Sequence, residues 1–241
     1  GETQKSAEQQ RLLGLASLGD ADRTLALPYA KEAVALNGKA FGTRFALFLA
    51  HMNLALIDGF SVEIAPCPNP FNPSLARQDE EAVQHLDNAL AIIDSLISTT
   101  EPKVSNDLKV WKLAAMACHP FKRVEAREYA AGSLAHPDVV PLFIVWSMFL
   151  GIEIQHGKLR KYLEDKIRKG AGDESYVVVA ALLVQEKEGS GTAAAAVIDK
   201  HQHLFPDAAS YFATWRKEVS GEGDADLLIQ VAKGHSSEFE T

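Results

Sequence analysis

The chain has 241 residues, of which 47% are hydrophobic and 23% charged, and its formal net charge at pH 7 is −8. This apolar fraction suffices for a continuous core and excludes global disorder, while the acidic balance disfavours nucleic acids and anionic membranes as partners. No apolar run approaches the roughly 20 residues that span a bilayer. The two cysteines, Cys67 and Cys118, form no disulfide framework, although a single disulfide stays open. We therefore expect a cytoplasmic protein in a reducing compartment.

The chain begins with polar residues and has neither an initiator Met nor the apolar segment of a signal peptide. We expect residues 1–8 to be a disordered start or a remnant of cloning. An alternative is that the sequence was excised from a larger protein, whose other domains hold the chemistry.

Apolar residues recur at helical spacing along most of the chain and predict helices. The first clear stripe is expected to end in a left-handed cap at Gly38. Residues 82–97 and 158–169 carry further stripes, and the most apolar stretch, 142–154, is interpreted as one buried helix. Three consecutive valines, Val177–Val179, favour a strand within 175–185, but no period-2 segment is available to pair with it, so we predict a helix there.

A proline-rich segment interrupts this pattern. Pro66–Pro73 contains four prolines, which remove backbone donors and predict an extended loop. Ala33 and Ala89 occupy equivalent small positions 56 residues apart, about 22 more than one 34-residue repeat. We interpret residues 60–78 as an insertion whose phenylalanines pack on the helices, or which covers a binding groove; its role stays open.

Small and aromatic residues recur at about 34 residues, the length of one helix-turn-helix repeat. This periodicity predicts an array of paired helices, and arrays of this kind mostly bind other proteins. The repeated residues are Trp111 and Trp146, 35 residues apart, Gly157 and Gly189, 32 apart, and Pro137 and Pro206, 69 apart.

These residues resemble a degenerate tetratricopeptide repeat (TPR), whose unit carries a Trp-Leu-Gly-Tyr pattern on its first helix and Ala-Phe-Ala-Pro on its second. In one unit Trp146 lies on the first helix and Gly157 takes the turn; in the next Gly189 takes the turn and Pro206 ends the unit. The resemblance implies an all-α, right-handed α-solenoid of antiparallel helix pairs over residues 9–219, with the proline-rich segment inserted.

The sequence departs from the repeat pattern at three positions. Leu150 and Leu182 stand where glycine or alanine is usual, and His201 replaces the alanine of the second helix. The number of repeats therefore stays open, and another α-solenoid family is an alternative.

The end of the chain is predicted to cap the array. Residues 220–241 are expected to form a capping helix around 224–233 and a loose tail. Leu227, Leu228 and Val231 would share one face of that helix and cover the last repeat.

No residue pattern points to catalysis, a cofactor or a metal. His201 and His203, two apart on a helix, point about 200° from each other and cannot chelate one ion, so we interpret them as solvated residues at a helix end. Ser190 is interpreted as a helix cap rather than part of a phosphate site. Nucleophile elbows, Walker motifs and paired zinc cysteines are absent. We therefore expect a protein that is not an enzyme and holds no cofactor.

Cations supply the candidate binding residues. Residues 158–169 contain six cations against only Glu164 and Asp165. This pattern is typical of a solvated helix face, and the functional alternative is a dock for an acidic peptide. Other polar candidates lie on predicted first helices of repeats. The predicted partner-binding residues are Arg44, Asn53, Lys109, Lys112, Lys158, Lys161 and Arg168.

We thus expect a non-catalytic scaffold or adaptor that binds a peptide or a partner helix in the groove of the repeats. The partner is another protein or peptide, with an acidic one as an option, and the oligomeric state stays open. The alternative is a ligand-sensing regulatory domain of a larger signalling or effector protein. A third interpretation is an enzyme whose active site no motif reveals.

Overall fold

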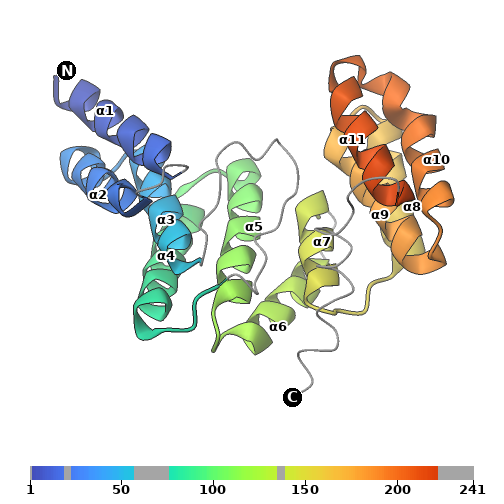
Figure 1. Ribbon diagram of the computed structural model, residues 1–241. Helices are drawn as coiled ribbons and strands as arrows, with labels where there is room; N and C mark the ends of the chain where they lie inside the picture. Colours follow the sequence, from blue (N-terminus) through green and yellow to red (C-terminus); the bar gives the residue numbers. More distant parts are fainter. Residues whose placement is uncertain (1, 19–22, 57–75, 135–138, 222–241) are drawn as a thin grey trace. The chain divides into compact units, whose positions relative to one another are not determined.

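The structure is a computed structural model that describes residues 2–18, 23–56, 76–134 and 139–221 (Figure 1). The described chain is all-α: its regular elements are eleven α-helices and short 3₁₀ turns, and the valine-rich segment predicted as a helix is one. It divides into two compact units, residues 1–129 and 130–241. The predicted repeat domain over residues 9–219 runs across both. The helices of the first unit are α1 (Glu2–Ser17), η1 (Arg23–Leu25), α2 (Ala26–Asn37), α3 (Phe41–Ala55), α4 (Glu80–Thr99) and α5 (Pro102–Cys118).

The remaining helices follow α6, which crosses the boundary between the two units. Residues 2–8, expected to be a disordered start, belong to α1 and are helical. The other elements are α6 (Arg123–Leu134), α7 (Pro141–Phe149), α8 (His156–Arg168), α9 (Glu174–Glu188), α10 (Gly191–His201), η3 (Gln202–Leu204), η4 (Pro206–Ala208) and α11 (Ala209–Ser220).

In the first unit, helices that are neighbours in sequence pack on one another: α1 on α2, α2 on α3, α3 on α4, and α4 on α5 (Figure 1). Small residues lie at these contacts, because alanine lets helix backbones approach closely. Ala33 and Ala89, the equivalent positions inferred from the sequence, are both fully buried. Larger side chains fill the space beside them. Phe48 is fully buried, and its ring meets the edge of Trp111 from α5 at 5.9 Å between centroids.

Ion pairs and caps define where the fourth helix begins. Asp79 caps α4 by accepting a hydrogen bond from the Ala82 amide at 2.9 Å. Arg77 forms an ion pair with the same carboxylate and donates to the Leu54 carbonyl of α3. Most of the predicted insertion, residues 60–75, lies outside the described residues, and so does its proline cluster.

In the second unit, α9 is the central helix: α7, α8, α10 and α11 all contact it. Its middle, Val177–Ala181, is fully buried. The three valines that favour a strand by propensity are helical here because helices surround them on several sides and bury each one. Gly189 ends α9 with a positive φ of 63°, which suits glycine, and Ser190 caps α10. Both roles were predicted from the sequence.

One predicted helix and one predicted turn differ from the structure. The apolar stretch 142–154 is not one helix, because α7 ends at Phe149 and Gly151 leaves the helix with a φ of 63°. Ile154 is nonetheless buried. Gly157, predicted as the turn glycine, lies instead in the first turn of α8. A glycine at position 151 can adopt the left-handed conformation that stops the helix six residues earlier.

The first predicted cap is also wrong in conformation. α2 ends at Asn37 as expected, but Gly38 has a φ of −68° and is right-handed. Thr43 of α3 donates a hydrogen bond to the Asn37 carbonyl at 2.7 Å and satisfies the end of α2 instead. The predicted capping helix around residues 224–233 lies outside the described residues.

Candidate interaction site

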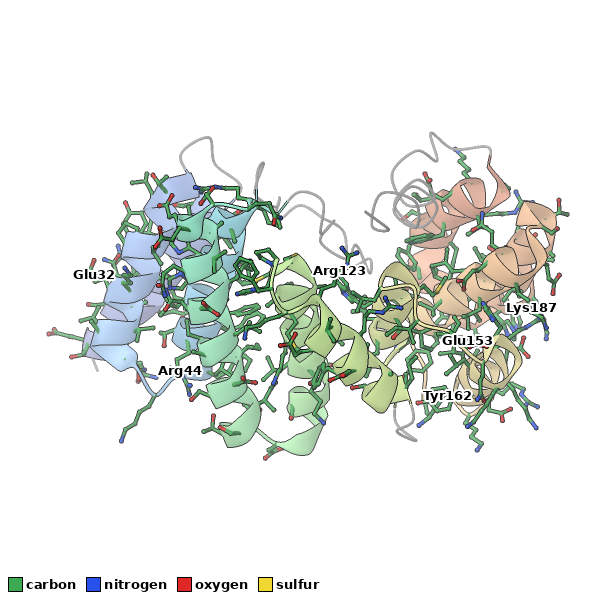
Figure 2. All side chains as sticks on the ribbon, turned by 90° about the horizontal axis from the view of Figure 1, so that it is seen from below. Glu32, Arg44, Arg123, Glu153, Tyr162 and Lys187 are labelled. Carbon is green, nitrogen blue, oxygen red and sulfur yellow. The ribbon has the colours of Figure 1, made fainter. Side chains whose placement is uncertain are left out.

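The eighth helix separates an apolar face from a basic one. Leu159, Leu163 and Ile167 are buried, and their spacing of four residues places them on one side of α8. Tyr162 anchors the helix by donating a hydrogen bond to the Val139 carbonyl at 3.0 Å; it is labelled in Figure 2. The opposite side of α8 therefore faces solvent.

Some cations of α8 have partners on the helix itself. Arg160 pairs with Glu164, one turn later, at 3.0 Å. Arg168 pairs with Asp165. The ammonium of Lys166 lies 5.5 Å from the centre of the Tyr162 ring. These contacts use both acidic residues of the helix.

Three further cations form what we call the basic stripe: Lys158 and Lys161 on α8, and Lys169, the residue that caps its C-terminal end. All three are exposed, and none has an ion-pair partner within the described part of the chain. Their positions fall on the side of α8 opposite Leu163, because each is about half a helical turn from the buried row. The stripe is thus a local excess of positive charge on a protein of net charge −8.

The beginning of α8 is tied to the end of α9. His156 Nε2 lies 2.8 Å from the Glu186 carboxylate. Gln185, which precedes Glu186 on α9, donates a hydrogen bond at 3.1 Å to the Val219 carbonyl at the end of α11. The first turn of α8 and the last turn of α11 therefore both contact the last turns of α9, α8 through Glu186 and α11 through Gln185.

The predicted partner-binding residues do not form one site. Arg44 (Figure 2) is half-buried on α3, in the first unit. Asn53 is fully buried and donates a hydrogen bond to the Leu18 carbonyl at 3.1 Å, so it cannot contact a partner. Lys112 pairs with Asp94 of α4 at 2.7 Å.

The two lysines of α5 and the cations of α8 thus have different environments. Lys112 also lies 5.1 Å from the centre of the Tyr129 ring, so it is held between two side chains of its own unit. Lys109 is half-buried on the same helix and has an internal interaction. Of the predicted set, Lys158 and Lys161 are exposed and have no ion-pair partner among the described residues, whereas Arg168 is exposed and pairs with Asp165. Lys169 was recognised as a cation but not as a binding residue; its location beyond the last acid of the helix was the available signal.

The buried histidines are structural. His201, predicted to be solvated, is only 5% exposed, and burial lowers its pKa; His203 is exposed, as predicted. His51 of α3 and His85 of α4 place their Nδ1 atoms 2.9 Å apart, so one ring donates and the other accepts. Burial, followed by the nearby His85, lowers the pKa of His51 to about 4. Both rings are therefore neutral near pH 7.

Cys118 and His119 are also buried. Burial raises the pKa of the Cys118 thiol to about 12, so it is protonated near neutral pH and is no nucleophile. The ring of His119 accepts a hydrogen bond from the Phe121 amide and faces Asp87 at 3.3 Å. Among the residues described, no group of three or more His, Cys, Asp or Glu side chains is placed to hold a metal ion. None of the described helices has the length and apolarity needed to cross a membrane.

A hollow that sequence reasoning did not identify lies beside α1. It has a volume of about 910 Å³ and is lined by α1 together with the connection from α2 to α3. Leu12 and Leu13 line it and are 53% and 39% exposed. The signal in the sequence was this pair of adjacent leucines, which follows the polar first half of α1. Gly42 also lines the hollow, where a β-carbon would lie 3.1 Å from the Arg11 side chain.

Comparison with known proteins finds no matching family model, no matching curated protein and no matching solved structure. The resemblance to tetratricopeptide repeats therefore stays a prediction drawn from the residues themselves.

Proposed function

We propose that this protein is a non-catalytic interaction scaffold that binds an acidic segment of a partner protein along the basic stripe of α8. The observation that carries the proposal is the contrast within that helix. Its two acids are used by Arg160 and Arg168, which leaves Lys158, Lys161 and Lys169 open to solvent. Open lysines on an acidic protein attract acidic segments and speed their association.

Helical packing supports the scaffold part of the proposal. From α1 to α5, each helix packs on the next one in sequence, and buried alanines lie on these helices. We propose that these helices form antiparallel pairs of a right-handed, TPR-like solenoid, and that the protein acts in the cytoplasm. Cys118 is free, buried and protonated near neutral pH, which agrees with a reducing compartment and with no nucleophilic role for this thiol.

The basic stripe can hold an extended or a helical acidic segment. The helix rises about 1.5 Å per residue, so Lys158 and Lys169 are roughly 16 Å apart along its axis. An extended peptide of about five residues spans that length. Carboxylates at alternate positions of such a peptide can therefore meet successive lysines.

A fluorescein-labelled oligoglutamate peptide tests the proposal by fluorescence anisotropy at low ionic strength. We expect the full chain to bind it, and Lys158→Glu/Lys161→Glu/Lys169→Glu to weaken binding by about tenfold or more, since three exposed charge contacts contribute roughly 0.2–1 kcal/mol each before reversal adds repulsion. Added salt is expected to reduce binding to the wild-type chain.

A matched control reverses three exposed lysines elsewhere: Lys39→Glu/Lys200→Glu/Lys217→Glu changes the net charge by the same amount. This control is expected to retain most of the affinity. Equal loss in both triple variants would show that only the overall charge matters and would overturn the site.

The hollow beside α1 favours a second candidate, the ligand-sensing domain. Its volume of about 910 Å³ lies within the range of small-molecule sites, about 300–1,000 Å³. Leu12→Gln/Leu13→Gln is expected to remove a thermal shift produced by a small apolar ligand. An apolar fragment library that stabilises both chains equally, or neither, would eliminate this candidate.

A further inference from the structure

The hollow beside α1 combines exposed apolar side chains with an excess of positive charge. Leu12 and Leu13 form part of its lining and are 53% and 39% exposed. Lys5 and Arg11 also line it, and Glu8 is the single acid among the described residues of the lining; two cations and one acid give a net charge of +1. A positive hollow on a protein of net charge −8 favours a negatively charged ligand.

The guanidinium of Arg11 is held in one orientation and keeps free donors. Its Nε and Nη2 atoms donate hydrogen bonds to the two carboxylate oxygens of Glu8, at 2.8 and 2.5 Å. A guanidinium has a second edge, formed by Nη1 and Nη2, and this edge of Arg11 has no acceptor within the described part of the chain. Glu8 therefore fixes the group, while a ligand carboxylate can accept from the free edge in a charge-assisted pair.

The start of α3 adds further donors beside Arg11. The residue before this helix is Ala40, whose methyl side chain cannot cap it. The backbone amides of Phe41, Gly42 and Thr43 therefore have no acceptor among the described residues. A β-carbon on Gly42 would lie 3.1 Å from Cδ and 4.0 Å from Cζ of Arg11, so the guanidinium lies over this first turn.

These two positive groups repel each other unless an anion lies between them. The first turn of a helix carries a partial positive charge, and a guanidinium beside it is unfavourable. Glu8 offsets part of this repulsion, but its carboxylate is bound to the other edge of Arg11. A ligand carboxylate placed between the free edge of Arg11 and the first turn of α3 is stabilised by both groups.

We propose that the hollow beside α1 binds an apolar monocarboxylate, a fatty acid of medium chain length. Its carboxylate accepts hydrogen bonds from Arg11, and its hydrocarbon chain lies on Leu12 and Leu13, which follow Arg11 directly in α1. A peptide would bury backbone amides against these leucines, which offer them no hydrogen bonds, so a hydrocarbon chain fits the lining better. The proposal rests on the second candidate function, the ligand-sensing domain, and does not depend on the basic stripe.

Calorimetric titration of the full chain with decanoate tests the proposal at about 0.15 M salt, where long-range charge effects are screened. Decanol, which has the same chain without the charge, is expected to bind about tenfold more weakly, because it forms no charge-assisted hydrogen bonds. Decylamine, with the opposite charge, should not bind. Hydrogen exchange with decanoate present should slow in α1 and in the first turn of α3, which locates the ligand.

Variants separate the carboxylate contact from overall charge. Lys5→Gln/Arg11→Gln is expected to weaken decanoate binding by about tenfold or more. The matched control Lys200→Gln/Lys217→Gln removes two exposed lysines of the second unit and should leave the affinity within about twofold. Gly42→Ala keeps every charge but displaces the Arg11 side chain, so it should also weaken decanoate binding while decanol binding stays the same.

Several outcomes would overturn the proposal: no binding of decanoate, equal binding of decanol, equal losses in the Lys5/Arg11 variant and its control, or slowed exchange only outside α1 and α3. A short peptide ending in leucine that binds more tightly than decanoate and displaces it would make a peptide the occupant instead. The basic-stripe variant, Lys158→Glu/Lys161→Glu/Lys169→Glu, should bind decanoate as the wild-type chain does. Failure with oligoglutamate therefore leaves this proposal standing, and failure with decanoate leaves the scaffold proposal standing.

Discussion

The lysines of α5 and α8 have different neighbours in the folded protein. Lys112 of α5 is held by Asp94 of the neighbouring helix at 2.7 Å and by the Tyr129 ring. Lys161 of α8 has no partner among the described residues, because both acids of its helix pair with arginines. The comparison shows that a lysine can bind a partner only when no acidic side chain of its own protein already pairs with it.

The same contrast extends to the other polar residues of the two units. In the first unit Asn53, His51 and His85 are enclosed and bond to other helices or to the chain between them. In the second unit, the three lysines of the basic stripe form no ion pair with another described residue. Substitutions inside the first unit should therefore change stability, and substitutions in the stripe should change binding.

The largest stability effect is expected from His51. Its pKa is lowered to about 4 in the folded state from 6.5, so the unfolded chain binds more protons between these values. Stability is complete above about pH 6.5 and is lost as the pH falls toward about 4, by roughly 3 kcal/mol at most. The charged groups around the pair are Lys31 on α2, Arg77, Asp79 and Glu81, the last of which lies 4.0 Å from His85.

Urea unfolding at several pH values measures this effect, and hydrogen exchange of α3 and α4 peptides locates it. We expect His51→Gln to flatten the difference between about pH 6.5 and pH 4.5, whereas His203→Gln, at an exposed position, retains it. A wild-type curve as flat as that of His51→Gln would show that the histidine pair does not set the acid sensitivity.

A smaller loss is expected from Asn53→Ala. This change leaves the Leu18 carbonyl without the donor that the amide supplies, and an unmade buried hydrogen bond costs about 1–3 kcal/mol. Hydrogen exchange should increase in α1 and α3, and binding of oligoglutamate should not change. If binding fell while stability held, Asn53 would regain the role of a contact residue that the sequence suggested.

The smallest effects compare the two lysines directly. Lys112→Ala removes a partly exposed ion pair and a cation–π contact and should lower the unfolding free energy by about 1 kcal/mol. Lys161→Ala should change it by less than about 0.5 kcal/mol while weakening oligoglutamate binding. Equal stability losses in urea titrations would mean that Lys161 has an internal role, and the distinction between the helices would be lost.

Local sequence patterns predicted most of the helices. Apolar residues spaced four apart predicted α4 and α8, because this spacing follows from the geometry of a single helix. Gly189 and Ser190 predicted the junction between α9 and α10, because helix ends favour these residue types. The end of α7 was missed because apolar residues continue past it. Ile154 is buried outside any helix, and periodicity does not distinguish that from a longer helix.

The candidate site was predicted only in part. The sequence identified the cations of α8, and helical spacing alone shows that Arg160 and Glu164 can pair. It could not show that Asn53 is buried and bonds to the Leu18 carbonyl, 35 residues away, or that Lys112 pairs with Asp94. Those contacts depend on how helices pack, and a side chain's neighbours across a helix interface are not set by its neighbours in sequence.

The sequence by itself therefore determined the all-helical class, the junction between α9 and α10 and the basic character of α8, because these follow from local propensity and spacing. Only the tertiary structure decided which polar residues are enclosed, which lysines stay open, and that α11 ends beside the start of α8. Burial and pairing across helices are properties of packed neighbours, and the free energy of each polar group depends on them.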